Sequence, residues 1–122
     1  MYEILIVGGG PAGLTAAIYA ARAGKHVAVL ERGSTGGQII SAPLVENYPG
    51  IPSVSGTELA RQMTEQACTF GAEIVYTEAV GLEKTPAGFR VLCTDGVREA
   101  KTVILATGAA HRRLDLPWET TL

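Results

Sequence analysis

Cysteine is scarce in this chain of 122 residues: only Cys68 and Cys93 occur, 25 positions apart. They form neither a Cys-x-x-Cys pair nor a zinc-ligand spacing, and two cysteines are too few for the disulfide framework of a small secreted domain. On a helix with about 100° per residue, Cys68 lies ~180° from Leu59 and therefore faces solvent. Cys93 alternates with Phe89 and Val91 on a strand and points inward. We therefore expect two separate thiols with packing or surface roles.

Long apolar runs and an excess of basic residues are also lacking. No stretch approaches the ~20 apolar residues of a membrane span. The first residues lack the basic start and apolar core of a signal peptide, so we expect a cytoplasmic protein without membrane association. Ten basic and twelve acidic residues give a net charge of −2, which argues against nucleic-acid binding. No Ser-His-Asp arrangement, carboxylate pair or metal-ligand cluster occurs, and we interpret His26 as structural and Glu46 as a solvated loop acid.

The first third of the chain predicts a strand, a helix and a second strand. Residues 4–7 form a short apolar run stopped by three glycines, which is typical of a buried parallel strand. Residues 11–23 are small or helix-forming; Pro11 suits a first helical turn and Gly24 a C-terminal cap. Residues 27–30 form another buried strand. Together these elements predict a βαβ unit with a right-handed crossover.

A long loop and a second helix are expected next. Residues 32–52 are rich in glycine and proline and predict a loop with one short helical turn at 38–41. A loop of this length in a compact domain is usually functional. Ser55 is expected to cap a helix that ends near Phe70 and Gly71. The predicted buried face of this helix carries Leu59, Met63, Ala67 and Phe70.

Alternating and apolar segments separated by turns predict five further strands. Three of them form a small antiparallel meander, and the last returns to the main sheet. The predicted fold is therefore α/β: a Rossmann-like, doubly wound parallel sheet with a small antiparallel β-meander insertion. The strands are expected at residues 73–76, 79–85, 89–94, 97–101 and 103–106.

Gly8, Gly10 and Gly13, at the end of the first strand and the start of the first helix, match the dinucleotide-binding pattern Gly-x-Gly-x-x-Gly. Gly8 permits the tight turn, Gly10 lets the backbone approach a pyrophosphate, and Gly13 lets the helix pack closely on the strand. The phosphates would face free backbone N–H groups and the positive end of the helix dipole, beside Pro11 and Ala12. A glycine-rich packing turn without a ligand is the structural alternative.

Glu31 stands 18 positions after Gly13, at the end of the second strand. A carboxylate there can accept hydrogen bonds from the ribose hydroxyls of the nucleotide, and it would repel a 2′-phosphate. The first nucleotide is therefore FAD or NAD rather than NADP. The local pattern does not separate these two.

The strand layout and several further motifs resemble the low-molecular-weight thioredoxin reductases over essentially the whole chain. The meander before the last parallel strand matches the flavoproteins that bind two dinucleotides. The combination of Gly-Gly-Gln with Val-Glu-Asn-Tyr-Pro-Gly is far more specific than the first glycine motif. The matching stretches are residues 7–24, 36–39, 45–50 and 105–109.

The resemblance implies FAD and assigns residues 1–109 to its binding domain, with residues 110–122 as a linker toward an NADPH domain. It places Gln38 and Asn47 near the isoalloxazine ring and Ala79 near adenine. The structural alternatives are self-capping of the loop for the two amides, strand packing for Ala79, and a strand-end turn for Thr107 and Gly108. The residues expected at the cofactor are Gly8, Gly10, Pro11, Ala12, Gly13, Glu31, Arg32, Gly37, Gln38, Asn47, Ala79, Ala106, Thr107 and Gly108.

The family passes electrons from NADPH through FAD to a Cys-x-x-Cys disulfide and then to thioredoxin, and its members form homodimers. Since these 122 residues contain no such cysteine pair and no second glycine motif for NADPH, we do not expect this chain alone to turn over disulfides. The run at 111–113 is interpreted as linker, and Trp118 departs from the small residue expected there. Two alternatives stay open: the front half of a ferredoxin–NADP reductase, and a non-catalytic nucleotide-binding module.

Overall fold

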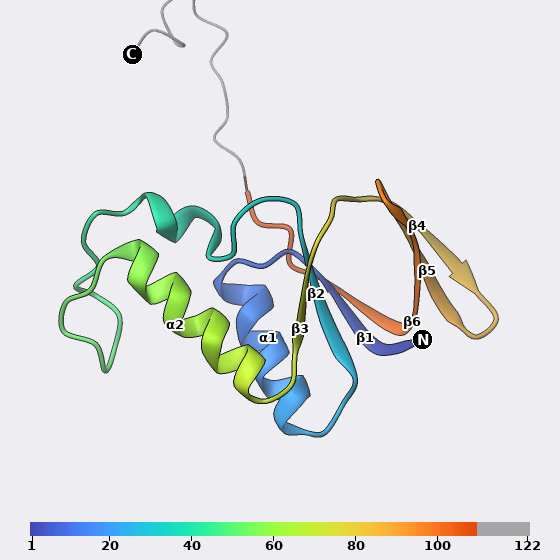
Figure 1. The fold of residues 1–122 in the computed structure, drawn as a ribbon, viewed down its shortest axis with the longest axis horizontal. Coiled ribbons are helices and arrows are strands. Elements are labelled where there is room, and N and C mark those ends of the chain that lie inside the picture. The colour runs from blue at the N-terminus through green and yellow to red at the C-terminus, as the bar shows by residue number, and fades with distance from the viewer. Residues whose placement is uncertain (110–122) are drawn as a thin grey trace, which may run out of the picture.

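The computed structural model describes residues 1–109. The predicted linker 110–122, with His111, Arg112, Arg113 and Trp118, lies outside the described residues. Figure 1 shows the fold. Its elements in chain order are β1 (Tyr2–Val7), α1 (Pro11–Arg22), β2 (Val27–Glu31), the 3₁₀ helix η1 (Gly37–Ser41), α2 (Gly56–Thr69), β3 (Glu73–Tyr76), β4 (Ala79–Thr85), β5 (Gly88–Cys93) and β6 (Gly96–Leu105).

One six-stranded sheet carries the fold, with the strand order β3-β2-β1-β6-β5-β4. β1 lies between β2 and β6 and pairs in parallel with both, and β3 pairs in parallel with β2. β4, β5 and the first half of β6 form the antiparallel meander. The predicted α/β class, the βαβ unit and the meander are confirmed.

β6 differs from the prediction, which placed separate strands at 97–101 and 103–106. The structure has one continuous strand, whose first half pairs with β5 and whose second half pairs with β1. Ala100 is paired on both sides, with Phe89 and with Tyr2. Thr102, between the two predicted strands, is β-branched and favours extended backbone, and its hydroxyl donates to the carbonyl oxygen of Glu3. The meander is therefore continuous with the parallel sheet.

The two faces of the parallel strands are covered by different elements. α1 and α2 pack side by side on one face, over a cluster that includes Ile6, Leu14 and Val29. On the opposite face Leu5 and Leu30 pack against Val91 of the meander. Figure 1 shows the helices and the β4–β5 hairpin on opposite sides of β1 and β2. The parallel strands thus form the middle layer of the described part of the chain.

The helix ends follow the sequence signals. Pro11 is the first residue of α1, and Gly24 follows its end with a φ of +79°. Ser55 caps α2 by accepting a hydrogen bond from the backbone N–H of Glu58 at 3.1 Å. Within residues 1–109, no helix is long and apolar enough to span a bilayer.

The buried face of α2 was predicted correctly except at its end. Leu59, Met63 and Ala67 are buried, but Phe70 is 42% exposed. Phe70 is the C-cap residue, where the backbone has left the helix, so the helical spacing no longer sets its direction. The guanidinium of Arg22 lies over its ring at 5.6 Å from the centroid, an arrangement that stabilises the pair at the surface.

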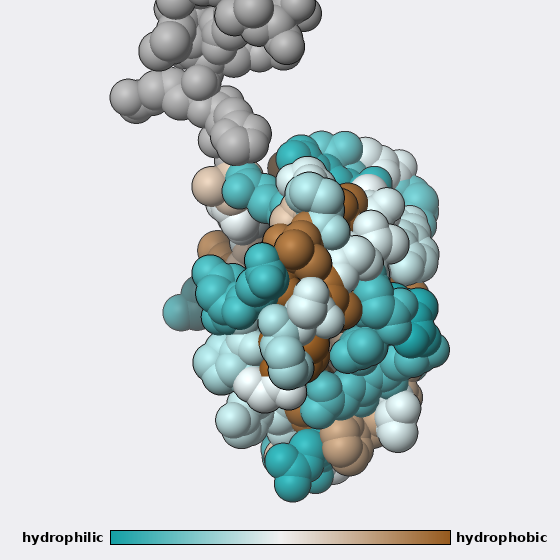
Figure 2. Space-filling view, turned by 90° about the vertical axis from the view of Figure 1, so that its left-hand side faces the viewer, coloured by the Kyte–Doolittle hydropathy of each residue, from teal (hydrophilic) through white to brown (hydrophobic). Residues whose placement is uncertain are grey.

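The long loop between β2 and α2 is anchored rather than open. The predicted helical turn is η1, and two antiparallel bridges, Val45–Val54 and Tyr48–Ile51, tie the following segment to itself. Ile39 and other apolar residues of the loop pack on the helix cluster, whereas Ile40, Leu44 and Tyr48 are exposed. Figure 2, which views the molecule from the end where this loop lies, shows an apolar strip framed by polar side chains.

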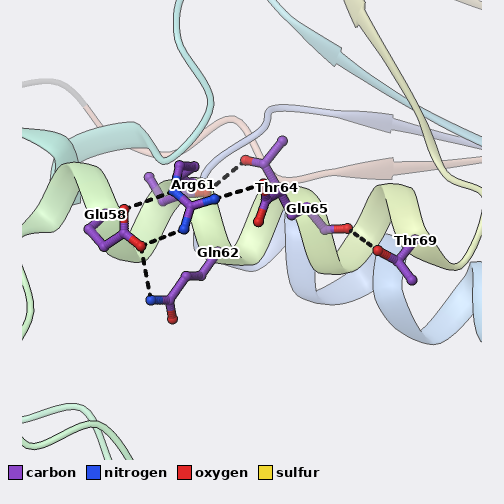
Figure 3. Close-up of polar contacts among 7 residues, drawn as sticks. Glu58, Arg61, Gln62, Thr64, Glu65 and Thr69 are labelled. Atoms are coloured by element: carbon purple, nitrogen blue, oxygen red, sulfur yellow. Dashed lines mark hydrogen bonds and ion pairs between the residues drawn. The ribbon is translucent and has the colours of Figure 1, made fainter.

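The exposed side of α2 carries a chain of charged contacts (Figure 3). Arg61 lies between Glu58 and Glu65, with nitrogen–oxygen distances of 2.6 and 2.7 Å. Gln62 also donates to Glu58. The hydrogen bond from Arg61, followed by that from Gln62, lowers the pKa of Glu58 to about 2.

Glu58 should make the stability of the fold depend on pH in the acid range. Because its pKa is lower in the folded state than its ordinary value of 4.5, the unfolded chain binds the extra proton and acid favours unfolding. The contribution is present above pH 4.5 and is lost as pH falls through about 2. We expect the Tm of Glu58→Gln to fall less over this interval than that of the unchanged chain. Thermal unfolding followed by circular dichroism measures this, and parallel Tm curves would contradict it.

The two thiols occupy the environments expected from the sequence. Cys68 is exposed, and Cys93 is half-buried against the cluster of Leu5, Leu30 and Val91. Because a thiol reagent needs solvent access to the sulfur, we expect Cys68 to react quickly and Cys93 slowly. Timed labelling of the native protein with Ellman's reagent, compared in the Cys68→Ser variant, measures the two rates. Equally slow labelling of both thiols would contradict the assignment.

Candidate functional site

The turn between β1 and α1 and the first turn of α1 are packed so closely that the fold requires two glycines, Gly8 and Gly13. Gly8 has a φ of +111°, and a Cβ there would overlap the backbone oxygen of Ala106. Gly13 is buried, and a Cβ there would overlap the backbone oxygen of Gly8. These positions bring the start of α1 against the ends of β1 and β6. Their glycines are explained by packing alone.

Gly10 is different, because the fold leaves room for a side chain there. A Cβ at this position would lie 3.7 Å from Gly37 Cα, an ordinary contact distance, and the backbone φ is −79°. Gly10 is the N-cap of α1, but it supplies no side-chain cap, and the first turn of the helix holds no acidic residue. The first N–H groups of a helix lack partners within the helix. They therefore leave a positive helix end available to an anion.

A long groove of about 510 Å³ runs past this helix end. A small pocket of about 190 Å³ lies beside it, and the two share Gly8, Glu31, Arg32 and Thr107. Apart from Gly13 and Asn47, every residue predicted to contact the cofactor lines one of them. In the groove these are Gly8, Gly10, Pro11, Ala12, Glu31, Arg32, Gly37, Gln38, Ala106, Thr107 and Gly108, and in the small pocket Gly8, Glu31, Arg32, Ala79 and Thr107.

The two remaining residues lie elsewhere. Gly13 is behind the groove, where its missing side chain allows the contact with Gly8. Asn47 is exposed in the bridged loop between η1 and α2 and lines neither hollow. Its contact with a cofactor stays a prediction.

Glu31 is turned inward across the glycine turn. One carboxylate oxygen accepts from Gly9 N–H at 2.9 Å, and the other accepts from Gly33 N–H at 2.7 Å. Each carboxylate oxygen has a further lone pair, so the group can accept hydroxyl donors from the groove while it keeps both backbone bonds. Gly9, the residue between the first two motif glycines, was not predicted to have a role. A Cβ there would lie 3.2 Å from the Glu31 side chain and would press on it.

Gln38 closes one wall of the groove. Its side-chain amide donates to the backbone oxygen of Ala109, and its own backbone oxygen accepts from the hydroxyl of Ser41. η1 is thereby tied to the segment that follows β6. The alternative left open by the sequence, that the Gln38 amide caps its own loop, is not what the structure shows, because this amide bonds the segment after β6.

Sequence reasoning missed several lining residues, and two of them directly follow a strand. Thr77 and Glu78 follow β3 and line the small pocket, and Ile39 and Ala109 line the groove. Ligands of open parallel sheets bind beyond the carboxyl ends of the strands. That rule would have identified Thr77 as a candidate, because it comes immediately after a predicted parallel strand. Among the described residues, no cluster of His, Cys, Asp or Glu could hold a metal ion.

The geometry can be compared with known proteins. A family model described as pyridine nucleotide-disulphide oxidoreductase matches residues 2–121. The chain belongs to this family. Among curated relatives of the chain, the thioredoxin reductase of Treponema pallidum is 43% identical over 120 residues. That match covers 98% of the chain and 39% of the relative, so the chain spans about two fifths of the relative's length.

Solved structures show the same part of the same family. The thioredoxin reductase of Lactococcus lactis has a TM-score of 0.93 at 39% identity, covering 98% of the chain and 40% of that structure. That of Streptococcus pyogenes has a TM-score of 0.90 at 47% identity, covering 96% and 38%. This member of the pyridine nucleotide-disulphide oxidoreductase family therefore has the fold of the corresponding part of thioredoxin reductases, as its motifs predicted.

Proposed function

We propose that the chain binds FAD and forms the N-terminal part of a thioredoxin-reductase-like flavoenzyme, which transfers electrons from NADPH through FAD to a disulfide. The observation that carries the proposal is Gly10. The fold has room for a side chain at this position. A phosphate that approaches the uncapped end of α1 would need a residue without one. The family match supports the reaction class.

The central part of the groove suits a pyrophosphate. Backbone N–H groups at the start of α1 and the helix dipole provide positive potential without a basic side chain. Pro11 fixes the first turn of the helix, and the small side chain of Ala12 leaves space in the groove beside it. These residues would bind the two phosphates that join the halves of FAD.

The two ends of the hollow suit the two halves of the cofactor. Glu31 would accept the ribose hydroxyls of the adenosine, whose base would enter the small pocket beside Arg32 and Ala79. At the other end, Gln38 and Thr107 would border the flavin half. Gly37, Ala106 and Gly108 are part of the groove lining there and leave room for the cofactor, with Asn47 approaching from the bridged loop.

When bound, FAD supplies the electron-carrying chemistry, and this chain's residues bind and orient it. The cysteine pair and the NADPH site of the proposed reaction would belong to further sequence of the whole enzyme, reached through residues 110–122. Residues 1–109 would then be the FAD-binding domain. The names of the thioredoxin reductase relatives support a thioredoxin-like protein as the substrate. We also include in the proposal a cytoplasmic homodimer, as the sequence and its family resemblance lead us to expect.

Release and identification of the bound cofactor test the proposal. The purified chain, with and without prior incubation with FAD, is denatured, and the released compound is identified by its absorbance and by chromatography. We expect FAD in about equal amount to the protein after reconstitution. Protein that stays colourless after incubation with FAD, or that releases NAD alone, would refute the proposed function.

A further inference from the structure

Thr77 joins the proposed nucleotide pocket to the meander. It follows β3 directly, and among residues 1–109 it is the only buried polar or charged residue, at 7% exposure. Its backbone N–H donates to the backbone oxygen of Glu31 at 3.0 Å. It lines the small pocket together with Glu31 and Ala79. A movement of Thr77 would therefore change the spacing between these two neighbours.

The side chain of Thr77 is held from outside the pocket. Its hydroxyl donates to a carboxylate oxygen of Asp95 at 2.6 Å. Asp95 lies in the turn between β5 and β6, and Arg98 donates to both of its oxygens, at 2.7 and 3.2 Å. The side chain of Arg98 is only 23% exposed. The Asp95 carboxylate, whose side chain is 53% exposed, is thus oriented by a two-point contact with Arg98 when it receives the threonine hydroxyl.

Electrostatics and the backbone support the same connection. The hydrogen bond from Arg98, and after it that from Thr77, holds the pKa of Asp95 well below its ordinary value, so the acceptor is ionised near neutral pH. Thr94 N–H donates to the backbone oxygen of Glu78 at 3.0 Å. The turn is thus bonded to two successive residues of the pocket wall.

Stabilisation of the turn alone does not explain this arrangement. The β5–β6 hairpin is already closed by the pairing of Cys93 with Gly96 and by the Asp95–Arg98 ion pair. The bond to Thr77 leaves the hairpin and reaches the segment between β3 and β4. A hydrogen bond to a charged acceptor is among the stronger ones in proteins, and here it is directed at the wall of a pocket.

We propose that Asp95, oriented by Arg98, is a positioning residue for nucleotide binding: through Thr77 it holds the wall of the small pocket at the spacing that an adenosine diphosphate group requires. This inference rests on the proposed function. It assigns to the meander a part in binding that the glycine motif does not provide. The contacted part of the ligand would be the adenosine half, which ADP shares with FAD.

Three variants of the purified chain test the inference, with Kd for FAD and for ADP measured by titration calorimetry. Thr77→Val keeps the side-chain volume but removes the hydroxyl, Asp95→Ala removes the acceptor, and Thr77→Ser keeps the hydroxyl. We expect the first two to raise both Kd values about five- to ten-fold. The double variant should be no weaker than the single ones, because both remove the same bond. Thr77→Ser should bind like the unchanged chain.

Thr102→Val is the matched control. It removes another threonine hydroxyl bond in the sheet, that to Glu3, but at the end remote from the pocket. We expect its Kd values to equal those of the unchanged chain. If Thr77 had a merely structural role, Thr77→Val would lower Tm and leave both Kd values unchanged, and this result would overturn the inference. The proposed function would still stand in that case, provided that the unchanged chain binds FAD. If the unchanged chain bound neither FAD nor ADP, the inference and the proposed function would both be refuted.

Discussion

Replacing Gly10 by alanine should weaken FAD binding by about ten- to a hundred-fold and leave the stability of the fold unchanged. The added methyl group fits the protein, since its nearest neighbour is Gly37 Cα at 3.7 Å. It would occupy the space through which a phosphate approaches the first N–H groups of α1. Hydrogen bonds to a charged group contribute about 1.5 to 3 kcal/mol each, so the loss of one accounts for this range. Fluorescence titration with FAD gives Kd, and thermal unfolding gives Tm.

Gly33→Ala is the control for this experiment. The substitution is the same, and a Cβ at Gly33 would also have room, because it would lie 3.7 Å from the Glu31 carboxylate. Unlike Gly10, Gly33 does not line the groove. Its Kd for FAD should be unchanged. If Gly10→Ala bound FAD as tightly as the unchanged chain, the phosphates would lie elsewhere and the central observation behind the proposed function would be lost.

The same substitution at Gly13 should have the opposite result, a large loss of stability. A methyl group there would overlap the backbone oxygen of Gly8. The overlapped atom belongs to the backbone, so no flexible side chain can move aside. Overpacking of a core costs about 1 to 3 kcal/mol and sometimes more, and backbone overlap places Gly13→Ala at about 3 kcal/mol or above. Urea unfolding measures this as a lower midpoint at unchanged slope.

Gly10→Ala serves as the comparison for Gly13→Ala, because both place one methyl group in the same motif. Equal unfolding midpoints for the two variants would show that the helix shifts to accept the Gly13 side chain, and the packing role assigned to that glycine would be wrong. The pair separates two functions within one pattern: room for a ligand at Gly10 and close contact between helix and strand at Gly13.

The features that the sequence predicted well depend on neighbouring residues. Pro11, Gly24 and Ser55 mark helix ends through their own backbone or side-chain chemistry, and they do so in the structure. The residues of the glycine motif were found because their spacing reflects a single strand–turn–helix unit. Local chemistry was sufficient in each of these cases.

The features that were missed depend on partners distant in sequence. β6 was divided in two because its halves pair with different strands, which no local pattern reveals. Phe70 was placed on the buried face by helical spacing, although the helix ends before it. Asp95 stood in a predicted turn and gave no sign that its carboxylate would meet Thr77, 18 positions earlier.

The two turns of the meander lie at opposite ends of its strands. The 94–95 turn is bonded to the pocket wall through Thr77 and Glu78, whereas the turn at Pro86 and Ala87 lies at the far end of β4 and β5 (Figure 1). A protein engineer who needs a place for an epitope tag or a fluorophore has one at this outer tip. Added residues there would project into solvent, while the register of β5 on β6 stays as it is.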